Sequence, residues 1–152
     1  MKEPLALDAL ISGIDRKLAP GVVRVDDDGV SAEVDVVDLD RLGVSVRGVK
    51  VRTAGPGDIA RQAERLPGAL EGLVEKVRPV EVDPALGGAV LRSTPRRREY
   101  YEVRTDGREV SVEKLRAGPE GRARVPFTLT REQLGRLVEG VGGVLTEDDP
   151  ER

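Results

Sequence analysis

Apolar and polar residues alternate in short runs along most of this chain, and turns rich in aspartate and glycine separate the runs. Alternation with a period of two is typical of half-buried β-strands. Within residues 98–115, two such runs flank Asp106-Gly107, a dipeptide favoured in two-residue type I′ hairpin turns. When the two runs pair around this turn, their apolar residues lie on the same face of the hairpin. Counting outward from the turn gives three facing pairs: Thr105 with Arg108, Val103 with Val110, and Tyr101 with Val112.

A third strand and a helix are predicted after this hairpin. Val125, Phe127 and Leu129 alternate as the strand, which follows a Gly-Pro turn. Thr130–Gln133 then has the pattern of a capping box, in which the threonine and glutamine side chains bond each other's backbone N–H groups. One apolar stripe marks the helix: Leu134, Leu137, Val138 and Val141. Residues 98–142 therefore predict a βββα unit.

The same order of elements is predicted for residues 22–77. Asp28-Gly29 is the hairpin turn here, and a shift of 78 residues superposes Asp28 on Asp106. The alternation of valines changes parity at Gly48, which predicts a β-bulge. Asp58 is placed to cap a helix that Pro67 should break or kink. The helix is expected to resume with Leu70, Leu73, Val74 and Val77 on one face. We interpret the two units as an internal duplication.

Three further segments complete the predicted architecture. An N-terminal amphipathic helix begins at Pro4, and residues 79–94 predict an extra hairpin. Residues 146–152 contain no apolar side chain and predict a disordered acidic tail. The apolar stripe of the N-terminal helix consists of Leu7, Leu10, Ile11, Ile14 and Leu18. The expected fold is a single α+β domain over residues 1–145, with two βββα units in one antiparallel sheet and the helices packed on one face.

Composition narrows the chemistry that this chain can perform. It contains no histidine and no cysteine, which excludes thiolate metal sites, disulfides and every nucleophile–histidine pair within the chain. The acidic residues at 26–28 and at 35, 38 and 40 lack the spacing of a calcium loop, so we interpret them as solvated turns. No apolar run approaches the ~20 residues that span a bilayer. We therefore expect a cytoplasmic, non-enzymatic protein without a metal, a cofactor or a membrane partner.

The strongest candidate site is basic. Residues 92–124 hold ten Lys or Arg against six Asp or Glu, and four of the arginines lie beside a tyrosine. Arginines next to an aromatic ring can bind phosphates or an acidic partner. The alternative is a solvated face whose charges are used in cross-strand pairs, since Arg104 is predicted to lie opposite Glu109. Tyr101 is assigned to the core. The candidate residues are Arg92, Arg96, Arg97, Arg98 and Tyr100.

Three classes of function remain open. The first is a protein-interaction module, such as an adaptor, a chaperone-like protein or an assembly subunit, which self-associates into a homodimer. The second is nucleic-acid or polyanion binding through Arg92 and Arg96–Arg98, against which the scarcity of aromatic side chains counts. The third is an enzyme that relies on carboxylate, arginine and tyrosine chemistry alone. We expect the first, by elimination of catalytic motifs.

Overall fold

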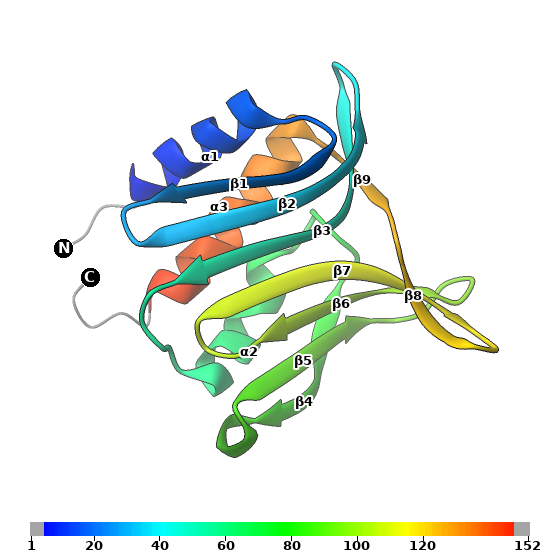
Figure 1. The fold of residues 1–152 in the computed structure, drawn as a ribbon. Coiled ribbons are helices and arrows are strands. Elements are labelled where there is room, and N and C mark those ends of the chain that lie inside the picture. Colours follow the sequence, from blue (N-terminus) through cyan, green and yellow to red (C-terminus); the bar gives the residue numbers. More distant parts are fainter. Residues whose placement is uncertain (1–4, 148–152) are drawn as a thin grey trace.

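The computed structural model describes residues 5–147, which form an α+β fold with a large antiparallel sheet and three α-helices (Figure 1). The elements follow in the order α1 (Leu5–Lys17), β1 (Gly21–Asp27), β2 (Val30–Leu39), β3 (Gly43–Thr53), α2 (Ile59–Ala69), β4 (Val77–Asp83), the short 3₁₀ helix η1 (Pro84–Leu86), β5 (Gly88–Ser93), β6 (Glu99–Thr105), β7 (Glu109–Gly118), β8 (Gly121–Val125), β9 (Phe127–Thr130) and α3 (Arg131–Glu147).

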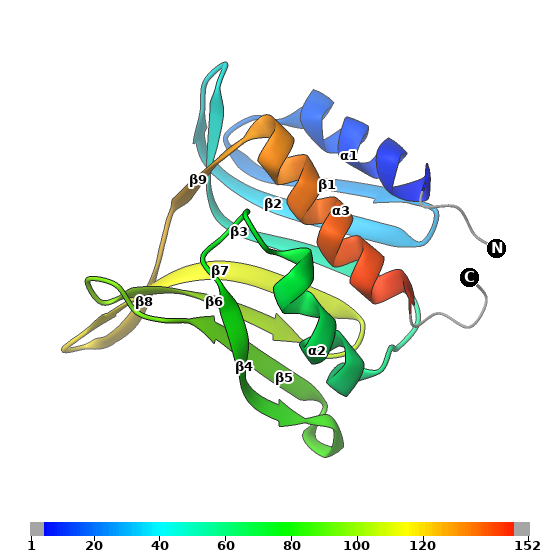
Figure 2. The same ribbon diagram turned by 180° about the vertical axis from the view of Figure 1, so that it is seen from behind.

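The sheet joins the two halves of the chain at its centre. Its strand order is β1-β2-β3-β7-β6-β5-β4, so β3 of the first half pairs with β7 of the second. β8 adds to β7, and β9 adds to β3. The three helices all lie on one side of the sheet, which leaves the other side without a helical layer (Figure 2). Any ligand of the sheet surface must therefore approach from this uncovered face.

Valine side chains of the sheet and leucine side chains of the helices form one continuous core. α3 lies between α1 and α2 and approaches both closely (Figure 2). Glycine makes this approach possible: a Cβ on Gly140 would lie 2.6 Å from the Ala69 carbonyl oxygen of α2, and one on Gly142 would lie 2.8 Å from Leu7 of α1. Leu7 and Leu10 of α1 are buried in the same core.

Several sequence predictions are confirmed at the level of single turns and caps. Asp28 and Gly29 both have positive φ angles, 49° and 80°, and Asp27 faces Val30 as a two-residue turn requires. The Asp58 carboxylate accepts a hydrogen bond from the Arg61 N–H at the start of α2. In the capping box of α3, Gln133 N–H donates to Thr130 Oγ1 over 3.0 Å, and Thr130 N–H donates to Gln133 Oε1 over 2.9 Å.

The bulge expected in β3 is also present. The pairing between β2 and β3 loses its regular register next to Gly48, between the pairs Asp35–Gly48 and Val36–Val46. The irregularity turns Val46 and Val49 to the same face of the sheet, and both are buried. A strand that kept its parity would have exposed one of them.

The predicted register of the second hairpin is wrong by two residues. Thr105 faces Val110, and Val103 faces Val112, so the loop is wider than the two-residue turn expected at Asp106-Gly107. The wider loop docks on the start of α2: the Gly107 carbonyl accepts hydrogen bonds from Gly57 N–H and from the buried Gln62 side chain. Because this loop gains tertiary partners, local turn preference does not decide its length.

The prediction of a single third strand in the second unit is wrong. It divides at Pro126 into β8, which pairs with β7, and β9, which pairs with β3. Proline has no backbone N–H and cannot continue the ladder along β7, so the chain leaves one strand there and joins another.

The predicted continuation of α2 is also wrong. The helix passes Pro67 and ends at Ala69, and Val77 already belongs to β4. Leu70 and Leu73 are buried but lie outside the helix, so their spacing indicates burial and does not indicate a helix. The extra hairpin expected over residues 79–94 is confirmed as β4 and β5.

Two further expectations concern the two ends of the chain. Thr146 and Glu147, expected in the acidic tail, form the end of α3, while residues 148–152 and Pro4 lie outside the described range. The internal duplication stays a prediction.

Candidate anion-binding site

A row of six residues crosses the uncovered face of the sheet, and all of them except Gly48 have charged side chains. Each member comes from a different strand, and each faces the next in the strand register. Two carboxylates, Glu102 of β6 and Glu113 of β7, are directly opposite each other. Like charges in this position destabilise a sheet unless other groups neutralise them. From β2 to β4 the row is Asp35, Gly48, Glu113, Glu102, Arg92 and Arg78.

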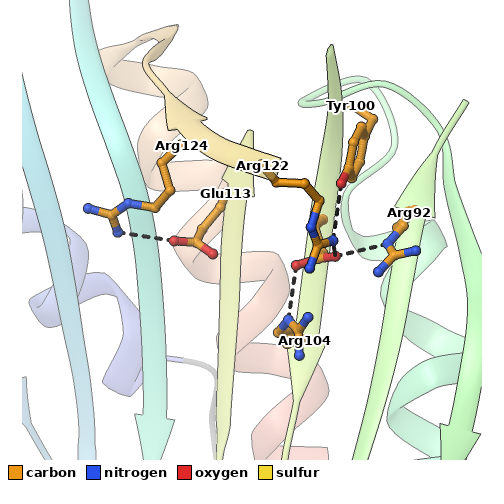
Figure 3. Close-up of polar contacts among 7 residues, drawn as sticks. Arg92, Tyr100, Arg104, Glu113, Arg122 and Arg124 are labelled. Atoms are coloured by element: carbon orange, nitrogen blue, oxygen red, sulfur yellow. Dashed lines mark hydrogen bonds and ion pairs between the residues drawn. The ribbon is translucent and has the colours of Figure 1, made fainter. Parts of the chain in front are cut away.

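β8 supplies part of the neutralising charge. Arg122 and Arg124 are two residues apart in this strand, so their side chains reach the same face of it (Figure 3). Arg122 Nη1 lies 3.1 Å from Glu102, whereas Arg124 contacts Glu113 at 3.0 Å and Asp35 at 3.1 Å. Through these two arginines, the exposed strand β8 connects Glu102 of β6 with Glu113 of β7. Arg124 extends the connection to β2.

Glu102 is the centre of the arrangement. Its carboxylate accepts hydrogen bonds from Arg92 Nε at 2.8 Å, from Arg104 Nε at 2.9 Å and from Arg122 Nη1 at 3.1 Å. The glutamate side chain is only 3% exposed, whereas those of Arg92, Arg104 and Arg122 are 39%, 50% and 44% exposed. Three positive charges surround one negative charge, which leaves a local excess of two positive charges. We call Glu102 with these three arginines the Glu102 cluster.

The arginines keep Glu102 ionised. Burial alone raises the pKa of Glu102, but hydrogen bonds and charge from Arg104 and Arg92 outweigh burial and hold the pKa below its usual range. Arg92 and Arg104 each bind the carboxylate through Nε. Their terminal nitrogen atoms are therefore held in place by a buried anion and can still donate to a second, external anion.

Tyr100 forms part of the support for the Glu102 cluster. Its hydroxyl oxygen accepts a hydrogen bond from Arg122 Nη1 at 3.1 Å, and the Arg92 guanidinium carbon lies 5.8 Å from the ring centroid. The tyrosine is buried, so the expectation that its ring is free for stacking is wrong. Tyr101 packs edge-on against Phe127 beside the core, as predicted.

Arg124 reaches Asp35 across Gly48, which lies between Asp35 and Glu113 in the row. A Cβ on Gly48 would meet Glu113 Cγ at 3.6 Å and Arg124 Nη1 at 3.8 Å. These are ordinary van der Waals distances, so the Arg124 guanidinium passes close to Gly48 as it connects Glu113 of β7 with Asp35 of β2.

The other predicted arginines lie at the tip of the β5–β6 hairpin. Arg96 and Glu99 exchange two backbone hydrogen bonds, of 2.8 and 2.9 Å, which close a two-residue turn over Arg97 and Arg98. Arg97 and Arg98 have φ angles of 53° and 70°, the left-handed region that a type I′ turn requires. A non-glycine residue in this region costs roughly 1–2 kcal/mol. The tip is thus a strained turn with three exposed arginines.

The structure brings two of the five predicted site residues together and places the other three apart from them. Arg92 and Tyr100 do come together, and Arg96, Arg97 and Arg98 do not touch them. Arg104 and Arg122 were not among the predicted residues, and Arg104 was expected opposite Glu109 because the register was wrong. The structure instead pairs Arg104 with Ser111 and directs its guanidinium to Glu102.

Comparisons with protein-family models, with curated proteins and with solved structures find no match for this chain. Within residues 5–147, no group of three or more metal-ligating side chains is placed to hold a metal ion. In the same range, no helix has the length and apolar character needed to cross a bilayer. The site must therefore be interpreted from its own geometry.

Proposed function

We propose that this chain is a non-enzymatic protein-interaction module that binds an acidic segment of a partner protein on the uncovered face of its sheet. The observation that carries the proposal is the Glu102 cluster. A buried carboxylate fixes three guanidinium groups that remain partly open to solvent. Such pre-organisation lowers the side-chain entropy that the arginines lose when a carboxylate-rich ligand binds.

An acidic peptide is a better ligand for this face than a nucleic acid. Proteins that bind single-stranded nucleic acid use exposed aromatic rings for stacking, and here Tyr100 and Phe127 are buried while Tyr101 packs against the core. On the same face, Lys50 and Arg24 already lie 4.0 and 3.9 Å from the carboxylates of Glu33 and Asp26, so these pairs offer little net positive charge to a long phosphate backbone. A short, flexible acidic segment can contact the cluster without crossing them.

The chemistry of the cluster also argues against acid–base catalysis. A general acid or base needs a pKa near the working pH, whereas Arg104 and Arg92 lower the pKa of Glu102 and so move it further from neutral pH. Glu102 is suited to hold arginines in place and not to exchange protons.

The proposal is tested with a fluorescein-labelled peptide of four glutamates and fluorescence anisotropy. We expect saturable binding that weakens as sodium chloride is raised, because the contacts are between exposed charges. Arg122→Gln should weaken binding about five- to tenfold, since it removes one of three positive charges from the Glu102 cluster. Arg16→Gln is the control, because it removes an exposed arginine of α1 on the other side of the sheet.

Two outcomes would overturn this function. Equal affinity of Arg122→Gln and the unaltered protein for the peptide would show that the cluster does not bind carboxylates. Salt-sensitive binding of duplex DNA, single-stranded RNA or heparin that is tighter than peptide binding would favour the polyanion alternative.

Self-association is a second candidate, favoured by an apolar patch at the β4 edge. Val80 and Val82 of β4 and Leu86 of η1 are 54%, 42% and 83% exposed. Pro79 and the register shift beside it hinder pairing with another strand, so a second copy would pack through side chains. Light scattering should then show a dimer that Val82→Glu dissociates. A monomer at high concentration would contradict this candidate.

A further inference from the structure

We propose that the arginine tip of the β5–β6 hairpin, Arg96–Arg98, is a second contact for the same ligand, so that the protein selects acidic segments long enough to reach from the Glu102 cluster to the tip. This inference rests on the proposed function and adds the length and direction of the ligand.

The arginine tip has positive charge that the fold does not use. Within residues 5–147, the side chains of Arg97 and Arg98 form no hydrogen bond and no ion pair, and that of Arg96 has one distant contact, with Glu75 at 3.9 Å. The arginines of the Glu102 cluster, in contrast, all bind Glu102. The charges at the tip are therefore available to a partner.

Folding does not explain the backbone conformation of the arginine tip either. The turn at Asp28-Gly29 has the same left-handed geometry and uses the residue pair that such turns favour. The tip adopts this geometry with Arg97 and Arg98, which strains the chain where a sequence of Asn-Gly would relieve it. Strain kept at an exposed, charged turn indicates that the side chains serve binding.

The position of the tip defines a path for the ligand. Arg104, Glu102 and Tyr100 lie along β6, and Arg98 precedes this strand, so the path from Arg104 to Arg98 is about 20 Å long at about 3.3 Å per residue. An extended acidic segment needs about six residues to cover it.

Charge also gives the path a direction. On the far side of Arg104 lies a groove of about 400 Å³ whose lining includes Glu81, Asp83 and Glu109, and these carboxylates repel an acidic chain. The ligand is therefore expected to extend from Arg104 toward the tip and not into the groove.

The test compares glutamate peptides of four and ten residues on the full chain. The key variant is Arg97→Asn/Arg98→Gly, which removes two charges and gives the turn its favoured sequence. We expect it to bind the ten-residue peptide about five- to tenfold more weakly and the four-residue peptide unchanged. Its thermal midpoint should rise by about 3 °C or more, because the turn is relieved of strain. Arg16→Gln/Arg41→Gln is the charge-matched control and should bind both peptides as the unaltered protein does.

The outcomes separate this inference from the proposed function. If the ten-residue peptide binds no more tightly than the four-residue peptide, or if the tip variant binds both as the unaltered protein does, the tip is not a contact, although the Glu102 cluster still binds. If neither peptide binds the unaltered protein, the proposed function fails as well. A tip variant with a lower thermal midpoint would remove the strain argument.

Discussion

At the scale of single residues, the most informative side chain is Glu102. A carboxylate that is nearly inaccessible on a face without helices needs a compensating environment, and three arginines from β5, β6 and β8 provide it. The arginines in turn owe their fixed positions to the carboxylate. Glu102 is thus a positioning residue for the proposed ligand and contributes to stability as well.

Glu102→Gln tests this double role. We expect a loss of about 1–2 kcal/mol in the free energy of unfolding at pH 7, because three partly exposed guanidinium groups lose their shared anion. The pKa of Glu102 is lowered in the folded protein, so its stabilising effect is complete above the ordinary value of 4.5 and is lost as the pH falls through the folded-state pKa. Urea titrations from pH 3 to pH 7 measure the difference.

The control for this experiment is Glu64→Gln on α2, an exposed carboxylate. It should change stability by less than about 0.5 kcal/mol at any of these pH values. A Glu102→Gln protein as stable as the unaltered one at pH 7 would contradict the role that we assign to the carboxylate.

At the scale of helices and strands, most elements are predicted correctly from the sequence. The predicted ends of some elements and the predicted pairing of some strands are wrong. The turn at Asp28-Gly29, the cap at Asp58 and the capping box at Thr130 depend on neighbouring residues, so the sequence alone identifies them. The loop at Gly107 depends on its bonds to Gln62 and the start of α2, which no local pattern reveals.

The candidate site illustrates the same limit. An excess of arginine in residues 92–124 is visible in the sequence, but the partner of each arginine depends on strand register and strand order. Arg124 contacts Asp35 across β3, and no spacing along the chain predicts that contact. Only the assembled sheet shows which arginines share Glu102.

Helix packing gives a prediction at this scale. Gly140→Ala should lower the free energy of unfolding by about 1–3 kcal/mol, because the new Cβ meets the Ala69 carbonyl oxygen of α2. Gly143 lies three residues later in α3, and a Cβ there meets no atom within 4 Å. Gly143→Ala should therefore stabilise the protein by up to about 1 kcal/mol through helix propensity.

Urea denaturation followed by circular dichroism compares the two variants. If both alanines stabilised the protein equally, the close contact between α2 and α3 would not limit the packing.

At the scale of the whole molecule, the two halves share one sheet and one core. The pairing of β3 with β7 joins them on one side, and β9 returns to β3 after the second half has formed its own hairpins. α3 packs against α1 from the first half and α2 beside the second (Figure 2). We therefore expect the halves to unfold together.

Differential scanning calorimetry of two core variants tests this expectation. Val34→Ala in β2 and Val103→Ala in β6 each truncate a fully buried side chain and should each cost about 2 kcal/mol. Both should lower the temperature of one common transition, with equal calorimetric and van't Hoff enthalpies. Two separated transitions, each shifted by one variant only, would show that the halves unfold independently.

The return of β9 to β3 also has a consequence for synthesis on the ribosome. Val44 and Val46 in the first part of β3 pair with Leu129 and Phe127, which are translated only after all of β4–β8. Until those residues emerge, the nascent protein carries an open strand edge that can recruit another chain. A translation product that stops at Pro126 lacks both β9 and α3, so it keeps this edge open and part of the apolar face of the sheet uncovered, and it should aggregate although it already contains every residue of the Glu102 cluster.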